Sequence, residues 1–143
     1  MRKNLSNSTK KRNYDLSDFI LQDYIGSGSF GRVYRIKEKK SQQIFAAKIS
    51  KIEITDIIDP SFINISREVN ILSRLNHPAI LKFIYYHPTN FKKEPKPVII
   101  TEYASNNSLL KIIKHDHISP NNKILTSTRK LILLYGISKG IAY

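Results

Sequence analysis

Short segments rich in β-branched and aromatic residues alternate along the chain with longer segments of helical period, and this pattern predicts an α+β fold. Some strand-like segments alternate apolar and polar residues, as 33–37 does, whereas 98–103 is a continuous β-branched run. Polar residues, Gly or Pro separate them. The expected strands are, in chain order, 19–25, 33–37, 44–49, 81–86 and 98–103.

The first expected helix has a clear start and a clear end. Asp59 is an acidic N-cap, and Pro60 occupies the first helical position. The helix should end near Leu75, because the following Asn76-His77-Pro78 disfavours a further turn. Between these points the apolar residues fall at helical spacing on one face. They are Ile65, Val69, Leu72 and Leu75.

Glu68 lies at the edge of that apolar stripe. An unpaired carboxylate beside a buried face is costly, so a partner for Glu68 is expected. The alternative is a solvated side chain that pairs with Arg67 or Arg74 at the surface of the helix.

Two further helices are expected in the second half of the chain. Ser108 is a suitable N-cap for a short helix over 109–114. The segment 127–143 has apolar residues at nearly every angular position, which is typical of a helix that is buried on all sides. These 143 residues offer it few neighbours, so we expect the helix to expose a large apolar patch that aggregates or recruits a partner. Between these helices lies His115-Asp116-His117. Two His and one Asp with no fourth ligand nearby indicate a loop, and no metal site is expected.

A glycine-rich segment lies between the first two expected strands and reads Ile25-Gly26-Ser27-Gly28-Ser29-Phe30-Gly31-Arg32-Val33. Glycines at this spacing let a backbone turn tightly and approach a phosphate without interference from Cβ atoms. Lys48, on an apolar strand further along, can place a positive charge against the same phosphate. The segment therefore predicts a phosphate-binding site.

The same glycine spacing also opens dinucleotide-binding βαβ units, in which a helix follows and an acidic residue lies about 20 residues further on. Glu53 stands near that position. The strand-like segment 33–37 directly after the glycines argues against this alternative, because a βαβ unit needs a helix there. A Gly/Ser surface hairpin with an ordinary strand lysine is the simplest non-functional explanation.

Composition narrows the class of protein. With 143 residues, of which 41% are hydrophobic, the chain is expected to be globular with a core of its own. It has no cysteine, which excludes a disulfide scaffold and suits a reducing, intracellular and cytoplasmic setting. No apolar run approaches the ~18 residues of a membrane helix, and the N-terminus lacks the apolar core of a signal peptide.

The formal net charge is +13, but the basic residues are spread along the chain. Residues 1–16 are mostly Asn, Ser, Lys and Arg and are expected to form a disordered basic arm. A net positive charge attracts anions, including nucleotides. Without a recognised nucleic-acid module, charge alone does not predict a nucleic-acid partner.

Taken together, these motifs resemble the N-terminal lobe of a eukaryotic protein kinase, from about Phe19 onward. Gly26, Gly28, Gly31 and Val33 resemble the glycine-rich loop of that family, and Ala46-Ala47-Lys48 resembles its strand-three lysine motif. The order and the spacing of these motifs both match.

Later parts of the chain extend the resemblance. The segment 67–72 is similar to the family's αC helix, and 75–81 is similar to the His-Pro turn that follows it. Thr101-Glu102-Tyr103-Ala104 resembles a gatekeeper residue and the hinge. Ser108-Leu109 and the last helix look most like the tyrosine-kinase-like branch. The resemblance implies an antiparallel sheet with an αC helix and a hinge over 17–104, and the start of a truncated C-terminal lobe over 105–143.

The resemblance also implies roles for individual residues. Lys48 would hold the α- and β-phosphates of ATP and pair with Glu68, and these two are the expected catalytic residues. Val33 and Ala46 would sandwich the adenine ring. Thr101 would leave a pocket behind it, and Leu72 and Phe83 would belong to the spine that links the lobes. The residues expected to bind ATP are Ile25, Gly26, Ser27, Gly28, Ser29, Phe30, Gly31, Val33, Ala46, Lys48, Thr101, Glu102 (through its carbonyl) and Ala104 (through its N–H).

The family's His-Arg-Asp, Asp-Phe-Gly and Ala-Pro-Glu segments do not occur within these 143 residues. The resemblance implies ATP-dependent phosphoryl transfer to protein Ser/Thr or Tyr in a complete domain. The polypeptide alone is expected to be inactive, because it lacks the catalytic Asp and the protein ligands of the Mg²⁺ expected in this family. The alternatives are a non-catalytic nucleotide-binding or docking module and a basic nucleic-acid binder, which only the charge favours.

Overall fold

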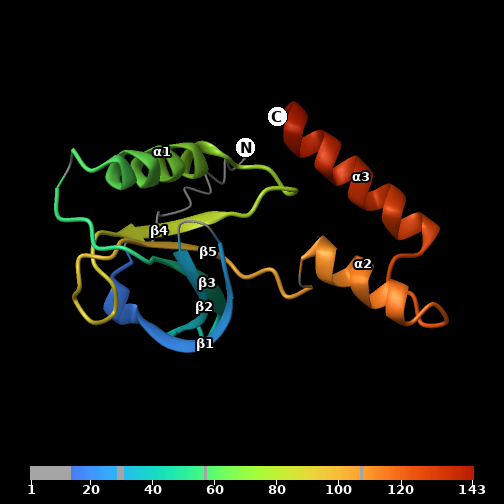
Figure 1. The fold of residues 1–143 in the computed structure, drawn as a ribbon, viewed down its shortest axis with the longest axis horizontal. Coiled ribbons are helices and arrows are strands. Elements are labelled where there is room, and N and C mark those ends of the chain that lie inside the picture. Colours follow the sequence, from blue (N-terminus) through green and yellow to red (C-terminus); the bar gives the residue numbers. More distant parts are fainter. Residues whose placement is uncertain (1–13, 29–30, 57, 107) are drawn as a thin grey trace, which may run out of the picture.

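The computed structural model describes residues 14–28, 31–56, 58–106 and 108–143. Five strands form one antiparallel sheet in the order β1-β2-β3-β5-β4 (Figure 1). The elements are β1 (Phe19–Ser27), β2 (Gly31–Glu38), β3 (Ile44–Ser50), α1 (Pro60–Arg74), β4 (Phe83–His87), β5 (Val98–Glu102), α2 (Leu109–Ile118) and α3 (Ser127–Ala142), preceded by a short 3₁₀ helix, Leu16–Asp18. The predicted α+β class is confirmed, and every expected strand and helix is present.

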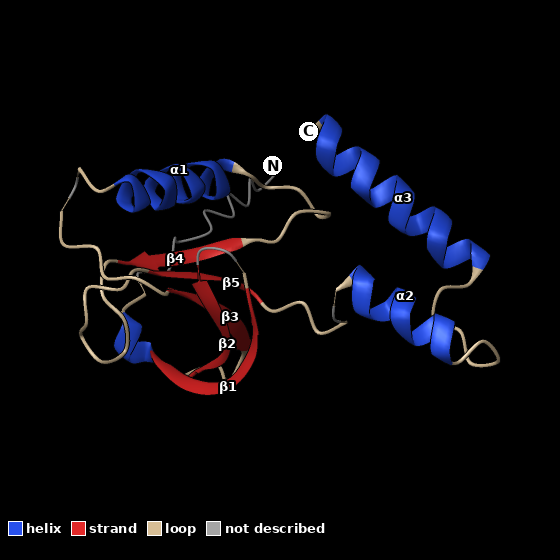
Figure 2. Ribbon diagram, viewed as in Figure 1, coloured by secondary structure: helices blue, strands red, loops and turns tan. Residues whose placement is uncertain are grey.

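The sheet buries its main core on one face, inside the curve formed by β1 and β2 (Figure 2). Strand β3 shows how the sequence assigns residues to faces, since Phe45, Ala47 and Ile49 are buried whereas Ala46 and Lys48 are only half-buried. The period of two in a strand therefore leaves Ala46 and Lys48 on the opposite face. The remaining buried residues of this core are Leu16, Phe19, Ile36, Val98 and Ile100.

Helix α1 covers the opposite face of the sheet (Figure 1). Ile65 of α1 packs in a second apolar cluster with Ile54 and Ile99. The sequence signals for its ends are confirmed, because Asp59 is the N-cap and accepts a hydrogen bond from the N–H of Ser61 at 2.7 Å. The helix ends one residue before Leu75, as expected.

The first described residues pack against the main core of the sheet and do not belong to the expected arm. Leu16 is buried in the main core, and the ring centroids of Tyr14 and Phe19 lie 5.4 Å apart. Asp15 fixes this segment by accepting a hydrogen bond from the N–H of Ser17 at 2.8 Å. The arm boundary at residue 16 is therefore corrected, and residues 1–13 lie outside the described part of the chain.

Helix α2 is longer than expected, so that His115-Asp116-His117 forms its last turn and not a loop. The Asp116 carboxylate accepts hydrogen bonds from the N–H groups of Ile124 at 2.7 Å and Leu125 at 2.8 Å. Desolvation opposes ionisation of Asp116, but these N–H donors and His115 outweigh it and hold the pKa of this carboxyl below its usual value. Asp116 thus fastens the turn between α2 and α3.

The exposed apolar patch expected on the last helix is present. Leu131 is 67% exposed and Ile141 is 83% exposed. Helix α3 approaches the sheet lobe along the edge that carries Gly136 and Gly140, which face Ala79 and Ile80 in the turn between α1 and β4 (Figure 1). Uniform apolarity made the helix suitable for burial, but burial depends on neighbours, and the neighbour on this edge is a single turn.

We predict that Gly31→Ala destabilises the fold by about 1–3 kcal/mol, as overpacking typically does. A Cβ at this position would lie 2.6 Å from the carbonyl oxygen of Ile49 in the adjacent strand. The control is Gly26→Ala, where an added Cβ would meet no atom within 4 Å. Urea unfolding of both variants measures the difference. Equal free energies of unfolding for the two variants would show that the contact between β2 and β3 at Gly31 is not tight.

Candidate functional site

A cavity of about 350 Å³ lies between the sheet, α1 and the segment that follows β5. Most of its wall is apolar, and a charged pair lies at one side. A concave, largely apolar site with a few convergent polar groups is the usual form of a small-molecule site. The lining residues are Ile25, Val33, Ala46, Lys48, Glu68, Leu72, Leu81, Ile99, Thr101, Glu102, Tyr103 and Ala104.

Strand register brings together lining residues that are far apart in the sequence. Val33 of β2 is paired with Lys48 of β3. On the other side of β3, Ala46 is paired with Thr101 and Lys48 with Ile99 of β5. Because residues directly opposite in adjacent strands share a face, these five side chains lie on one patch of the sheet.

Lys48 and Glu68 form the expected ion pair across β3 and α1. The Lys48 Nζ lies 2.6 Å from Oε1 and 2.9 Å from Oε2 of Glu68. The two side chains are 29% and 30% exposed, so the pair is partly shielded from water. This arrangement replaces the alternative in which Glu68 pairs with Arg67 or Arg74 at the surface.

The glycine-rich hairpin places only part of its expected residues at the cavity. Ile25 and Val33 line it, whereas Gly26, Ser27, Gly28 and Gly31 lie on the same hairpin outside the lining. Ser29 and Phe30 lie outside the described residues.

Two of these glycines have open space around them. A Cβ on Gly26 or Gly28 would meet no atom within 4 Å, and neither residue has a positive φ. Contacts among the described residues therefore do not account for glycine at these two positions. Gly28 is held from the side by Lys51, whose Nζ donates to the Gly28 carbonyl at 2.8 Å.

The segment after β5 forms the remaining wall. The Glu102 side chain accepts a hydrogen bond from the N–H of Lys82 at 2.9 Å, which anchors the end of β5 to the residues before β4. Thr101 Oγ1 donates to the Glu102 carbonyl at 3.1 Å. Ala104 is exposed at the end of this wall.

Three residues line the cavity that no sequence motif marked, namely Leu81, Ile99 and Tyr103, and Leu72, which was expected only in the spine, lines it as well. The place of Tyr103 at the cavity could have been predicted, because it lies between the expected residues Glu102 and Ala104. Ile99 requires knowledge that β3 pairs with β5 in the register that places it opposite Lys48. Leu81 belongs to no helix or strand, so periodicity gave no signal for it.

Three features define a protein kinase-like N-terminal lobe. They are a five-stranded antiparallel sheet, a helix whose carboxylate pairs with a strand lysine, and an apolar cavity beside that pair. The comparison with protein families agrees, since the model of the protein kinase domain matches residues 19–143. The chain therefore belongs to the protein kinase family.

Individual relatives support the same family. An Aurora kinase of Candida glabrata is 34% identical over 127 residues, which is 88% of this chain and 33% of that protein. The serine/threonine-protein kinase Nek11 of Macaca fascicularis is 33% identical over 120 residues, 80% of this chain and 18% of that protein. NUAK family SNF1-like kinase 1 of Mus musculus is 37% identical over 107 residues, 74% of this chain and 15% of that protein.

The chain thus spans between 15% and 33% of the length of these three relatives. None of these three relatives is named as a member of the tyrosine-kinase-like branch that Ser108-Leu109 and the last helix suggested, so that branch is not supported.

We predict that Lys48→Met changes the free energy of unfolding by less than about 1 kcal/mol, because a partly exposed ion pair contributes little to stability. The control is Ile65→Ala, which removes a buried side chain of α1 and should cost about 2–5 kcal/mol. Urea unfolding monitored by circular dichroism measures both. A loss of several kcal/mol in Lys48→Met would show that the pair is a structural element of the fold and is not held chiefly for a ligand.

Proposed function

We propose that this chain is the ATP-binding lobe of a protein kinase domain, which in a complete domain serves ATP-dependent phosphoryl transfer to a protein hydroxyl group. The observation that carries the proposal is the bidentate Lys48–Glu68 pair at the side of an apolar cavity that the glycine-rich hairpin borders. In this family such a lysine binds nucleotide phosphates, and the glutamate holds the lysine in place.

Each wall of the cavity has a proposed task. Ile25, Val33 and Ala46 provide apolar surface for the two faces of the adenine ring. The Glu102 carbonyl and the Ala104 N–H are proposed to bind the edge of the ring. The carbonyl oxygen has two lone pairs, of which Thr101 uses one, so it can accept a second hydrogen bond.

The glycine-rich hairpin is proposed to cover the phosphates. The open space beside Gly26 and Gly28 supports this, because a backbone without Cβ atoms lets an anion approach the N–H groups closely. Lys48 would contribute the positive charge. A lysine already held by a carboxylate loses less side-chain entropy when it binds a phosphate.

The residues of this cavity do not fit a magnesium site. Its two carboxylates are Glu68, which is engaged by Lys48, and Glu102, which is engaged by the N–H of Lys82. Mg²⁺ prefers free carboxylate oxygens and water. No step of the proposed function is therefore assigned to a metal held by these residues.

We further propose Ser/Thr as the acceptor class, which the name of the Nek11 relative favours. We infer an intracellular, cytoplasmic setting from the absence of cysteine in the sequence. Among the described residues, none of the helices has the length and apolarity needed to cross a bilayer.

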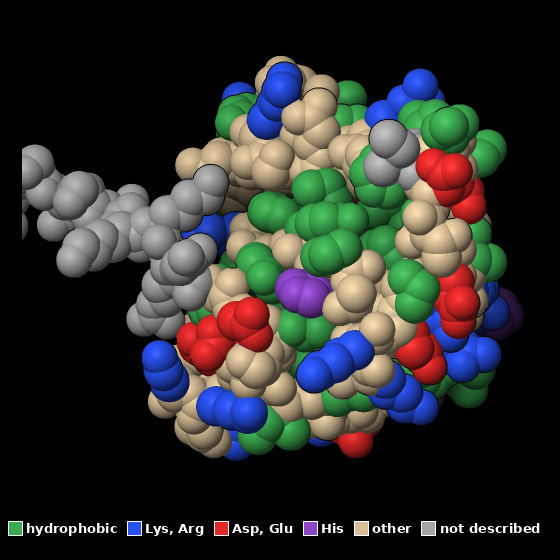
Figure 3. Space-filling model, turned by 90° about the vertical axis from the view of Figure 1, so that its left-hand side faces the viewer, with side chains coloured by type: hydrophobic (Ala, Val, Ile, Leu, Met, Phe, Trp, Pro, Cys, Tyr) green, Lys and Arg blue, Asp and Glu red, His purple; other side chains and the backbone are tan. Residues whose placement is uncertain are grey.

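A non-catalytic nucleotide-binding or docking module is the second candidate, and the exposed apolar surface of α3 favours it. Exposed apolar patches of this kind commonly mark surfaces that bind another protein. A nucleic-acid binder has less support, since basic side chains are interspersed with apolar, acidic and neutral ones on the face shown in Figure 3. Binding to a duplex would favour a continuous basic stripe.

We predict that ATP binds the 143-residue chain weakly, because the chain lacks the family's Mg²⁺ ligands. Lys48→Met should weaken this binding about tenfold further, because a charge-assisted contact to phosphate is lost. Lys111→Met is the matched control, since it removes an exposed lysine of α2 outside the cavity. Isothermal titration calorimetry gives both affinities. Equal affinities for the two variants would contradict a phosphate-binding role for Lys48.

We also predict that a polypeptide of these 143 residues does not transfer phosphate to protein, because it contains no His-Arg-Asp or Asp-Phe-Gly segment. Transfer of radiolabelled phosphate from ATP to a generic protein substrate should equal the background of the Lys48→Met variant. Transfer above that background would show that these residues contain a complete catalytic apparatus. Together with ATP binding, the predicted result distinguishes a nucleotide-binding lobe from a complete enzyme.

A further inference from the structure

A second cavity, of about 380 Å³, lies between β2, β3 and the loop that joins β4 to β5. Among the described residues, none lines both this cavity and the cavity that is proposed to bind ATP. Its lining includes four basic residues, Arg32, Lys51, Lys92 and Lys96, and one acidic residue, Glu94.

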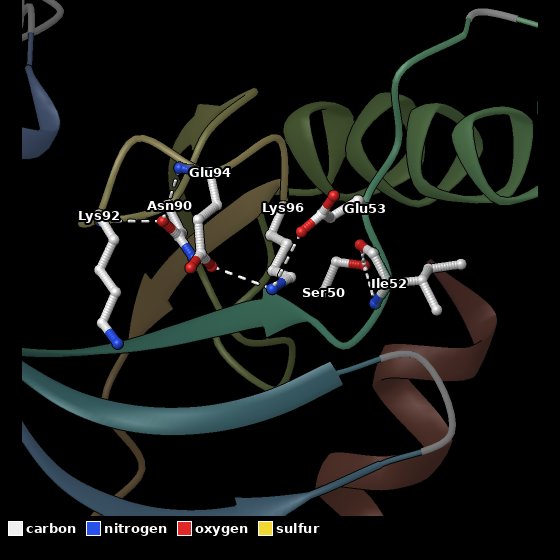
Figure 4. A network of polar contacts seen from close by, with 7 residues as sticks. All are labelled: Ser50, Ile52, Glu53, Asn90, Lys92, Glu94 and Lys96. Carbon is white, nitrogen blue, oxygen red and sulfur yellow. Dashed lines mark hydrogen bonds and ion pairs between the residues drawn. The ribbon is translucent and has the colours of Figure 1, made fainter.

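The acidic residue is already neutralised within the loop. Glu94 Oε2 accepts hydrogen bonds from Lys96 Nζ at 3.0 Å and from Asn90 Nδ2 at 2.8 Å. Figure 4 shows this network, in which Lys96 also approaches Glu53, with 3.5 Å between Nζ and Oε1. The hydrogen bonds from Lys96 and Asn90 lower the pKa of Glu94, so the carboxylate stays ionised and engaged.

Three positive charges remain at the cavity after this pairing. None of the described residues forms an ion pair with Arg32, Lys51 or Lys92. The ammonium group of Lys92 points away from the Glu94 carboxylate in Figure 4. Lys51 donates to the Gly28 carbonyl, but an ammonium group has three donors and can hold an anion at the same time.

The loop that carries Lys92 is held in a fixed conformation. The side chain of Asn90 is buried, and its Oδ1 accepts hydrogen bonds from the N–H groups of Lys92 at 2.8 Å and Glu94 at 3.1 Å. The carbonyl of Pro97 accepts from the N–H of Ser50 at 2.9 Å, which ties the end of the loop to β3. A prearranged set of cations loses less entropy on binding an anion than a mobile one.

Apolar side chains complete the lining and indicate what accompanies the anion. Leu21, Tyr34 and Phe91 line the cavity next to the basic groups. A free inorganic anion would leave this apolar surface unused. A volume of about 380 Å³ lies within the range of organic ligands and exceeds the needs of a lone oxyanion.

From this arrangement we propose that the second cavity binds a phosphorylated serine or threonine side chain in an extended protein segment, with neighbouring apolar residues of that segment against Phe91 and Tyr34. A phosphorylated side chain carries a charge between about −1.5 and −2 at pH 7 and presents three acceptor oxygens. Three cations without acidic partners match such a dianion better than the single charge of a carboxylate. Arg32 supplies the planar fork that suits phosphate, and Lys51 and Lys92 supply point charges.

The test is a titration of the isotopically labelled 143-residue chain, followed by the backbone amide NMR signals of residues 50–52, 90–94 and 96. The probes are the peptide Gly-Leu-phosphothreonine-Leu-Gly, its unphosphorylated form and inorganic phosphate. We expect the phosphopeptide to shift these signals and the unphosphorylated peptide to leave them unchanged. Inorganic phosphate should bind more weakly than the phosphopeptide.

Variants distinguish binding by the lining residues from a general attraction to the positively charged chain. Lys92→Gln and Arg32→Gln should each weaken phosphopeptide binding by about tenfold. Lys93→Gln removes the same charge from the same loop, but Lys93 does not line the cavity, so binding should change less than about twofold. Because all three positions are exposed, the variants should keep the fold.

The proposal is overturned by any of three results. A phosphopeptide that shifts no signals in these segments contradicts the site. Equal weakening by Lys93→Gln and Lys92→Gln contradicts a defined set of ligating residues. If inorganic phosphate binds as tightly as the phosphopeptide, the cavity does not recognise a peptide segment and is only an anion site.

Discussion

The ion pair between Lys48 and Glu68 joins the sheet to its helix at one side of the cavity. It forms only if β3 presents Lys48 on the face opposite the main core and if α1 turns Glu68 toward that face. The first condition follows from the alternation Phe45, Ala46, Ala47, Lys48, Ile49, which buries every second residue. The second follows from Ile65, which anchors α1 in the second apolar cluster one turn before Glu68.

The two faces of the sheet therefore differ in how far they are buried. One face holds the main core, where Ile36, Val98 and Ile100 are fully buried and determine stability. The other face is packed by α1 along part of its length and is left open over Ala46 and Lys48. A partly exposed ion pair adds little to stability. We therefore propose that the pair serves to position Lys48 for a ligand more than to stabilise the fold.

Local signals in the sequence were sufficient for much of this arrangement. The caps Asp59 and Leu75 define α1 because capping is a property of a few adjacent residues. We could predict Lys48, Glu68 and the segment 101–104 as site residues, because each lies in a motif made of adjacent residues. The structure brings them to one cavity, and their binding roles remain proposals.

The features that the sequence did not reveal depend on distant partners. Ile99 joins the site through the register of β3 and β5, and Leu16 is buried because Phe19 and Phe45 surround it. The last turn of α2 exists because Asp116 meets N–H groups eight and nine residues further on. Helix α3 differs from these cases, because its uniform apolarity already predicted an apolar patch that the described residues leave exposed.

The most direct test of the central claim is to locate bound ATP on the chain. Adenine protons of ATP should show nuclear Overhauser effects to the methyl groups of Val33 and Ala46 in a methyl-labelled sample, because these two side chains are proposed to enclose the ring. The same effects should be weaker in Lys48→Met at equal ATP concentration, because this variant is predicted to bind ATP about tenfold less tightly. Effects to methyl groups outside the cavity, with none to Val33 and Ala46, would contradict the account.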